Sequence, residues 1–314
     1  MTAADDFRAA LQAQLGGAPE HIEPGRLHRF SLNGKRGDTA GWCKLFDDGR
    51  AGVFGDFRSG ASGTWTARSR EQMTPAERAT LARQIEQATR ERVAQQRAQW
   101  LRNAAMLARL WAQARPVTDG DPVALYLRHR LGCRIEVPQC LRHHPSLDYR
   151  HDGELVGRWP AMLAQLTTPA GQVIALHRTW LTPQGRKAQA PGPVKKLTPT
   201  AGPMAGACIR LAEPSQGRIG IAEGIETALA ACCASGVPTV AAYSAGALAA
   251  WQWPASVRRV LVFADADPAG ADAADKLSQR ARAAGLSVNV IAPTTPGTDW
   301  ADVWAAREPL EAAP

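Results

Sequence analysis

The last hundred residues of the chain alternate short apolar runs with helix-forming segments, and this alternation restricts the fold more than any other feature of the sequence. Apolar runs occur in "GRIGIAEG", "VPTVAAYSAG", "RRVLVFADAD" and "LSVNVIAP". Segments such as "IETALAACCASG" and "PAGADAADKLSQRARAAG" have the composition of helices closed by glycine. Strands that alternate with helices form parallel sheets whose faces the helices cover. We therefore predict an α/β domain, with helices on both faces of a parallel sheet, over residues 214–314.

Carboxylates follow three of these predicted strands. Glu223 follows "IGIA", whereas Asp265 and Asp267 follow "VLVFA". Asp299 and Asp302 come shortly after the last strand, in "PGTDWADVW". Because the carboxyl ends of parallel strands meet at one edge of a sheet, we expect these side chains to gather there. Carboxylates without compensating lysines repel one another unless a hard cation neutralises them, so the sequence predicts a site for Mg²⁺ or Mn²⁺.

Several of these acidic residues, and Glu226 beside them, also have a purely structural explanation. Asp267 precedes Pro268 and is typical of a helix N-cap, and Asp302 is suited to cap the helix that follows it. Glu226 fits an exposed position on a surface helix. The order of the three motifs along one predicted edge favours the metal site over these explanations.

Three further segments precede the α/β domain. Residues 1–70 alternate short apolar and aromatic runs with Asn-Gly, Asp-Gly and Ser-Gly turns, which predicts a small β-rich domain. Residues 71–115 are rich in arginine and are predicted to form one long helix or a helical hairpin. Residues 116–213 combine a helix, several strands and a basic loop, and we expect an α+β domain there.

The net charge of +8 is distributed unevenly along the chain. The balance is +6 over residues 1–115, +5 over residues 116–214 and −3 over the remainder. This split suggests a polyanion as the partner of the basic part and a cation as the partner of the acidic part, although an ordinary basic surface would also account for it. No apolar run is long enough to span a membrane, and the acidic start does not resemble a signal peptide, so we expect a cytoplasmic protein without membrane contact.

The six cysteines argue against a structural zinc site. They include no CxxC pair. Cys133 and Cys140, followed by His143 and His144, can be drawn as ligands, but the same segment fits a strand and a turn with buried thiols. We expect no structural zinc.

The segments "IAEGIETALA", "VLVFADADPAGADAADKL" and "PGTDWADVW" resemble, in order, the motifs of a Toprim domain. The resemblance is strongest to the DnaG-like DNA primases of plasmids, phages and other mobile elements. It implies that Glu223 is a general acid or base and that Asp265 and Asp267 bind Mg²⁺. It also implies that Asp299 completes the acidic cluster. Here the last pair is spaced DxxD where these primases often have DxD, so the role of Asp302 as a metal ligand is less firmly implied.

The resemblance extends upstream of the Toprim motifs. "GQVIALHRTWL" places Arg178, and "VKKLTPTAGPMAGACIRL" places Lys195 and Lys196, where these primases have basic residues. This implies that the three side chains bind nucleotide or template.

The N-terminal segment resembles the zinc ribbon of primases in layout only, since it keeps a single ligand, Cys43. One hypothesis is a metal-free unit in which Arg58, Phe54, Phe57 and Trp65 contact single-stranded DNA by charge and stacking. The alternative is that these aromatic rings form the core of a small sheet.

The function predicted from the sequence is therefore that of a DNA primase. Such an enzyme makes short primers from nucleoside triphosphates on a single-stranded DNA template, for replication of a plasmid, phage or integrative element. The chain has no G-x-x-x-x-G-K-[ST] motif, so we expect a separate replicative helicase as a partner. Two alternatives remain: a Toprim nuclease that cleaves phosphodiesters, and a non-catalytic DNA-binding adaptor of the replisome.

Overall fold

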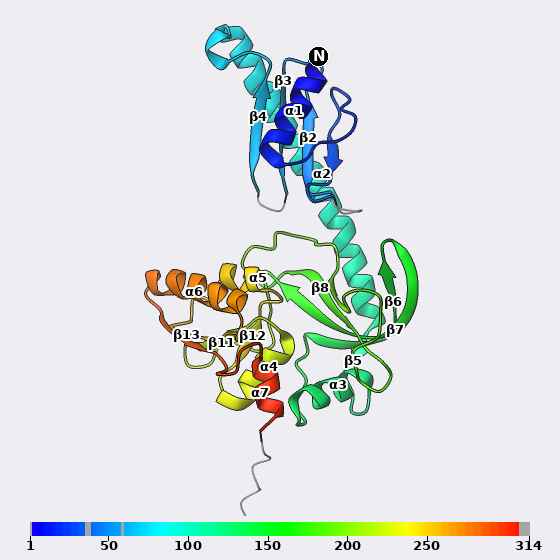
Figure 1. The fold of residues 1–314 in the computed structure, drawn as a ribbon, viewed down its shortest axis with the longest axis vertical. Coiled ribbons are helices and arrows are strands. Elements are labelled where there is room, and N and C mark those ends of the chain that lie inside the picture. Colours follow the sequence, from blue (N-terminus) through cyan, green and yellow to red (C-terminus); the bar gives the residue numbers. More distant parts are fainter. Residues whose placement is uncertain (1, 35–38, 58–59, 308–314) are drawn as a thin grey trace, which may run out of the picture. The chain divides into compact units, whose positions relative to one another are not determined.

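The computed structural model describes residues 2–34, 39–57 and 60–307. The chain divides into two compact units, residues 1–99 and residues 100–314 (Figure 1). The boundary falls within helix α2 (Pro75–Gln113), which is one uninterrupted helix. No helix among the described residues combines the length and the apolar composition needed to cross a membrane.

The first unit is built around a four-stranded antiparallel meander, as the turn signals predict. Helix α1 (Ala3–Leu15) buries Phe7 and Leu11 against one group of sheet residues, and the first part of α2 buries Leu81 and Ala88 against another. A short 3-10 turn, η1 (Arg70–Gln72), precedes α2. The strands are β1 (His28–Phe30), β2 (Gly41–Leu45), β3 (Ala51–Asp56) and β4 (Ser62–Thr66).

The aromatic residues of this unit lie in its core or pack against it. Phe54 is only 2% exposed and packs on Phe7, as does Trp65. Phe57 lies against Trp42 and under the guanidinium of Arg29. For Phe54 this burial favours the alternative that the ring forms part of the core of a small sheet, because it packs in the cluster that α1 covers. Arg58, the predicted basic contact, lies outside the described residues.

The second unit contains one mixed sheet of ten strands. Its order is β14-β13-β11-β12-β10-β7-β6-β5, with β8 paired to β7 and β9 paired to β8. The strands β11 to β14 are parallel to their neighbours among themselves, whereas β10 is antiparallel to both β12 and β7. The parallel strands are β11 (Arg218–Ala222), β12 (Thr239–Ala241), β13 (Arg259–Phe263) and β14 (Ser287–Ile291). The others are β5 (Arg115–Pro116), β6 (Leu141–His151), β7 (Glu154–Thr167), β8 (Val173–Trp180), β9 (Lys195–Leu197) and β10 (Cys208–Ile209).

Helices cover both faces of this sheet, as predicted. One buried cluster joins α3, α4 and α7 to the sheet through residues such as Leu127, Leu229 and Ala301. A second cluster joins α5 and α6 to the parallel strands through Leu248 and Leu277. The end of α2 packs on β6, β7 and β8. The helices are α3 (Pro122–Leu131), α4 (Ile225–Ser235), α5 (Ala245–Ala250), α6 (Pro268–Ala283) and α7 (Trp300–Ala305).

These features confirm the predicted fold class. A parallel α/β domain follows an α+β region, a long helix and a small β-rich N-terminal unit. The sheet is continuous from β5 to β14, so the α+β region and the α/β domain share one hydrogen-bonded framework.

Candidate active site

Three adjacent strands of the parallel sheet end at the same level. The last residues of β11, β13 and β14 are Ala222, Phe263 and Ile291, and they are neighbours in register. The chain therefore leaves all three strands at one edge, which is the edge that carries binding sites in such sheets.

The segment after β13 places two carboxylates by local geometry. Asp267 is the N-cap of α6, and its Oδ1 accepts a hydrogen bond of 2.7 Å from the Gly270 N–H. Pro268 follows at the first helical position, as the sequence predicts. The backbone of Ala266, between Asp265 and Asp267, is hydrogen-bonded to Gly297 and Thr298. These bonds tie the loop that leads to Asp299 to the Asp265 segment.

Asp299 and Asp302 form the start of α7. Asp299 is the N-cap, and its Oδ1 accepts a hydrogen bond of 2.8 Å from the Asp302 N–H, while Asp302 Oδ2 accepts one from the Asp299 N–H. The DxxD spacing is therefore that of a capping box, in which the first and fourth residues cap one another. Both carboxylates also contact Arg130 of α3, at 3.4 Å from Asp299 Oδ2 and 3.2 Å from Asp302 Oδ1.

The carboxylates at this edge influence one another. Burial, together with Glu223, Asp299, Asp267 and Asp302, raises the pKa of Asp265 to about 7. The pKa of Glu223 is also raised, chiefly by burial and secondarily by Asp267. Burial and neighbouring like charges raise the pKa of a carboxyl group in this way, and such raised pKa values are frequent at functional sites.

The donor set at this edge fits a hard divalent cation in part. Asp265 Oδ1 is buried and has no hydrogen-bond partner among the described residues, which leaves an oxygen free to accept a cation. Asp299 and Asp302 are already engaged by Arg130. Across the described ranges, no three acidic, histidine or cysteine side chains are grouped closely enough to hold a metal together. Asp267 Oδ1 already accepts from the Gly270 N–H, and Asp299 and Asp302 would have to exchange their bonds to Arg130 before they could bind a cation.

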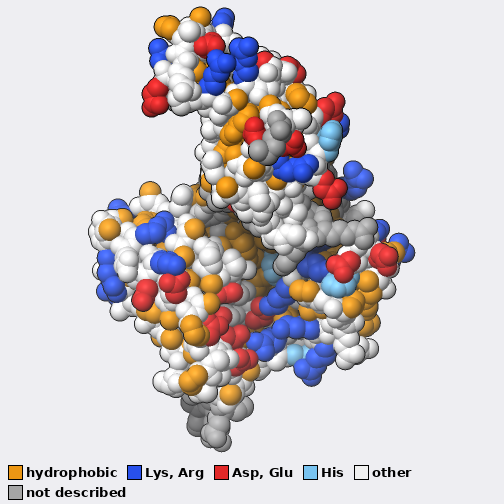
Figure 2. All heavy atoms as spheres, turned by 45° about the horizontal axis from the view of Figure 1, so that its top comes forward, with side chains coloured by type: hydrophobic (Ala, Val, Ile, Leu, Met, Phe, Trp, Pro, Cys, Tyr) orange, Lys and Arg blue, Asp and Glu red, His pale blue; other side chains and the backbone are white. Residues whose placement is uncertain are grey.

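The side chains of the predicted basic residues lie on opposite faces of the sheet at β8 and β9. Lys195 Nζ lies 2.8 Å from Glu226 Oε2 and interacts electrostatically with Glu223. Lys196, the next residue, points the other way because side chains alternate along a strand; it lies over the Tyr149 ring and donates to the Arg150 carbonyl. Arg178, opposite Lys196 in register, donates to the Leu197 carbonyl. Figure 2 shows acidic side chains beside basic ones on the surface of this unit.

Three residues of this region do not appear among the predicted site residues. Arg130 and Tyr126 come from α3, and Glu226 comes from α4. The expectation that Glu226 is an exposed helix residue is wrong, because α4 is buried from Ile225 to Ala231. A single charge in this apolar stretch, "IETALAA", was the available signal, since a buried charge requires a partner.

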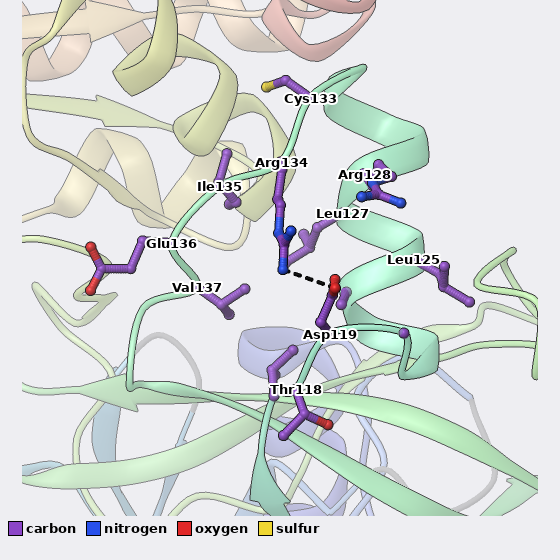
Figure 3. A pocket seen from close by; sticks show the side chains of 13 residues that line it. Thr118, Asp119, Leu125, Leu127, Arg128, Cys133, Arg134, Ile135, Glu136 and Val137 are labelled. Atoms are coloured by element: carbon purple, nitrogen blue, oxygen red, sulfur yellow. Dashed lines mark ion pairs between the residues drawn. The ribbon is translucent and has the colours of Figure 1, made fainter.

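A separate cavity lies beside α3 (Figure 3). It has a volume of about 280 Å³ and is lined by α3 and by residues 117–120 and 133–137. An ion pair of 2.8 Å joins Arg134 to Asp119 in its wall. None of the predicted site residues lines it.

Comparisons with known proteins identify two segments of the second unit. Residues 218–309 match the model of a family described as the Toprim domain, and residues 101–211 match a domain of unknown function, DUF7146. No curated protein sequence matches the chain.

Several solved primase structures show a weak similarity. A DnaG catalytic core has 16% identity and a TM-score of 0.35, over 46% of this chain and 47% of that one. A DNA primase domain from Pseudomonas aeruginosa has 17% identity and a TM-score of 0.35, over 50% of this chain and 51% of that one. The Aquifex aeolicus primase, with its zinc-binding and RNA polymerase domains, has 13% identity and a TM-score of 0.38, over 96% of this chain and 81% of that one. The chain thus spans about half the length of the first two structures.

These TM-scores are all below 0.5, so the solved structures support no conclusion about this chain. The family match and the geometry of the acidic edge identify the domain instead. The match begins with β11 and includes Glu223, Asp265, Asp267, Asp299 and Asp302. The parallel sheet and its acidic edge agree with the resemblance of the three sequence motifs. Residues 218–309 of this chain therefore form a Toprim domain.

Proposed function

We propose that the chain is a DNA primase that makes short primers on a single-stranded DNA template by nucleotidyl transfer. The observation that carries the proposal is the buried Asp265 oxygen at the acidic edge of the Toprim domain, which has no hydrogen-bond partner in the part of the chain that the structure describes. Lys195, from the preceding region, interacts electrostatically with Glu223 at the same edge. A cation-binding edge next to a fixed positive charge suits a reaction in which the substrate is a polyphosphate.

Each residue of the edge has a role in this proposal. Asp265 and Asp267 would hold Mg²⁺ or Mn²⁺, with Asp299 and Asp302 available once Arg130 releases them. When bound, the cation supplies positive charge that stabilises the phosphates. Glu223 would accept the proton of the primer 3′ hydroxyl as that oxygen attacks the α-phosphate and pyrophosphate leaves. Its raised pKa supports this role, because a base acts best when its pKa approaches the working pH.

The basic residues would bind the other parts of the substrates. Lys195 would bind a phosphate of the incoming nucleoside triphosphate, whereas Arg178 and Lys196 would support template binding from the other face of β9. Replication of a plasmid, phage or integrative element, with a separate helicase as partner, is the biological setting that the sequence resemblance favours.

Primer synthesis tests the proposal directly. The full chain is incubated with single-stranded DNA, labelled nucleotides and Mg²⁺, and it is compared with Asp265→Asn and with a control, Asp272→Asn. Asp272 is an exposed carboxylate of α6 that pairs with Lys276. We expect short products from the wild type, a loss of about 100-fold in Asp265→Asn and little change in Asp272→Asn, since of these two carboxylates only Asp265 would hold the cation that stabilises the phosphates.

Two results would overturn the proposal. Mg²⁺-dependent cleavage of DNA without primer synthesis, lost in Asp265→Asn, would indicate a Toprim nuclease. DNA binding without either activity would indicate an adaptor.

A further inference from the structure

Glu226 is a buried carboxylate held by two residues from distant parts of the chain. It is 3% exposed, and it lies in the first turn of α4, three residues after Glu223. Its Oε1 accepts a hydrogen bond of 2.6 Å from the Tyr126 hydroxyl of α3. Its Oε2 accepts one of 2.8 Å from the Lys195 ammonium of β9.

Glu226 remains charged despite its burial. Desolvation acts to raise its pKa, but Lys195 and the Tyr126 hydroxyl together lower it below the ordinary value. A carboxylate in such an environment is retained only with partners of this kind, because an unpaired buried charge is strongly destabilising.

The two side chains of the Glu226–Lys195 ion pair differ in exposure, and this difference suggests that the lysine also contacts a ligand. The Glu226 side chain is almost completely enclosed, whereas the Lys195 side chain is 36% exposed. A lysine has a long flexible stem and three donor N–H groups, and its hydrogen bond to Glu226 uses one of them. Glu226 thus fixes the ammonium while leaving the others able to reach a ligand from the solvent side.

The fixed ammonium lies close to the acidic edge. Lys195 Nζ lies 2.8 Å from Glu226, which follows Glu223 by three residues, and Lys195 partly offsets the burial that raises the pKa of Glu223. Glu223 directly precedes Gly224, the N-cap of α4, and Glu226 lies in the first turn of that helix, so only two residues separate the carboxylate of the proposed reaction from the anchor of the lysine.

We propose that Glu226 is a positioning residue that holds the Lys195 ammonium beside Glu223 to receive a phosphate of the nucleoside triphosphate. The Tyr126 hydroxyl fixes the orientation of the Glu226 carboxylate in this arrangement. The inference rests on the proposed function for the identity of the ligand. Fixing Lys195 in advance reduces the conformational entropy that the side chain loses when a phosphate binds.

A double-mutant cycle on the full chain tests this role. Binding of a fluorescent ATP analogue with Mg²⁺ is measured for the wild type, Glu226→Gln, Lys195→Met and the double variant. Glutamine keeps the size of the side chain and an oxygen for Tyr126. The control is Glu213→Gln, which removes an exposed carboxylate that lies 3.9 Å from Arg210. Thermal unfolding of each variant is recorded in parallel.

We expect Glu226→Gln and Lys195→Met each to weaken nucleotide binding by about tenfold, the equivalent of roughly 1.4 kcal/mol. The double variant is expected to bind no more weakly than Lys195→Met, because Glu226 acts through Lys195. Where primers are made, the KM for nucleotide should rise more than kcat falls. Glu213→Gln should bind as the wild type does.

Three results would overturn the inference. The first is a loss of thermal stability in Glu226→Gln with unchanged nucleotide affinity, which would show a purely structural role. The second is additive losses in the double variant. The third is no nucleotide binding by the wild type, which would overturn the proposed function as well. Absence of primer synthesis with the expected binding pattern would overturn the proposed function alone.

Discussion

His177 shows how a single buried side chain couples this fold to pH. Burial, with a smaller contribution from Lys195 and Arg178, lowers its pKa from 6.5 to about 4, and Glu226 only partly opposes this effect. The folded protein therefore keeps a neutral imidazole over a range in which the unfolded chain takes up a proton. Because the unfolded state binds more protons between pH 6.5 and pH 4, the free energy of unfolding falls as the pH falls through that range.

We expect His177 alone to lower the free energy of unfolding by about 2 kcal/mol between pH 7.5 and pH 5. For a unit of this size, this corresponds to a decrease of roughly 4–8 °C in Tm. Thermal unfolding at several pH values would be compared for the wild type, His177→Gln and a control at the exposed His21, His21→Gln. The pH dependence should become shallower only in His177→Gln. Equal slopes in all three proteins would contradict the prediction.

Individual residues also show what the sequence could reveal about the site. The carboxylates were predictable, because each follows a strand whose apolar run is visible in the sequence. Arg130 and Tyr126 were not, since "YLRHR" reads as an ordinary amphipathic helix until the fold brings α3 against α4 and α7. The Lys195 and Lys196 side chains point to opposite faces because side chains alternate along a strand. This could be predicted only if the two residues were known to form a strand.

At the scale of the element, the approach of α6 to the preceding loop depends on one glycine. A Cβ at Gly270 would lie 2.6 Å from the carbonyl oxygen of Asp265 and 3.2 Å from its backbone nitrogen. Both atoms belong to the backbone, so the helix or the loop would have to move. Asp267 caps the N-terminus of α6, and the first turn of this helix packs closely against the backbone of Asp265. Both are possible together because residue 270 has no side chain.

We expect Gly270→Ala to lower the free energy of unfolding by about 1–3 kcal/mol, the usual cost of overpacking. Gly246→Ala in α5 is the matched control, because among the described residues a Cβ there would meet nothing within 4 Å beyond its chain neighbours and the adjoining backbone of its own helix. That substitution should be neutral or should stabilise by up to about 1 kcal/mol through helix propensity. Denaturant unfolding of both variants gives the comparison, and similar values for the two would show that the contact at Gly270 is unimportant.

At the scale of the whole molecule, the sheet of the second unit does not stop where the sequence changes character. Composition and periodicity change near residue 214, which made a separate α/β domain the natural prediction. In the structure, β10 from the region before this point pairs with β12 from the region after it. Such pairing between distant segments has no local sequence signal, whereas the alternation of strands and helices within the Toprim domain has a strong one.

This continuity predicts that the Toprim domain depends on the region before it. A fragment of residues 214–314 would lose β10 from the edge of β12 and would expose α4 residues that now pack with Leu127 and Met162. It would also leave Glu226 without Tyr126 and Lys195. Loss of the partners of a buried charge costs about 3–5 kcal/mol, a large fraction of the stability of a typical domain. We therefore expect residues 100–314 to unfold in a cooperative transition, and residues 214–314 alone to show none when both fragments are heated and followed by circular dichroism. If the shorter fragment melts sharply near the temperature of the longer one, the shared sheet contributes little to the stability of the Toprim domain.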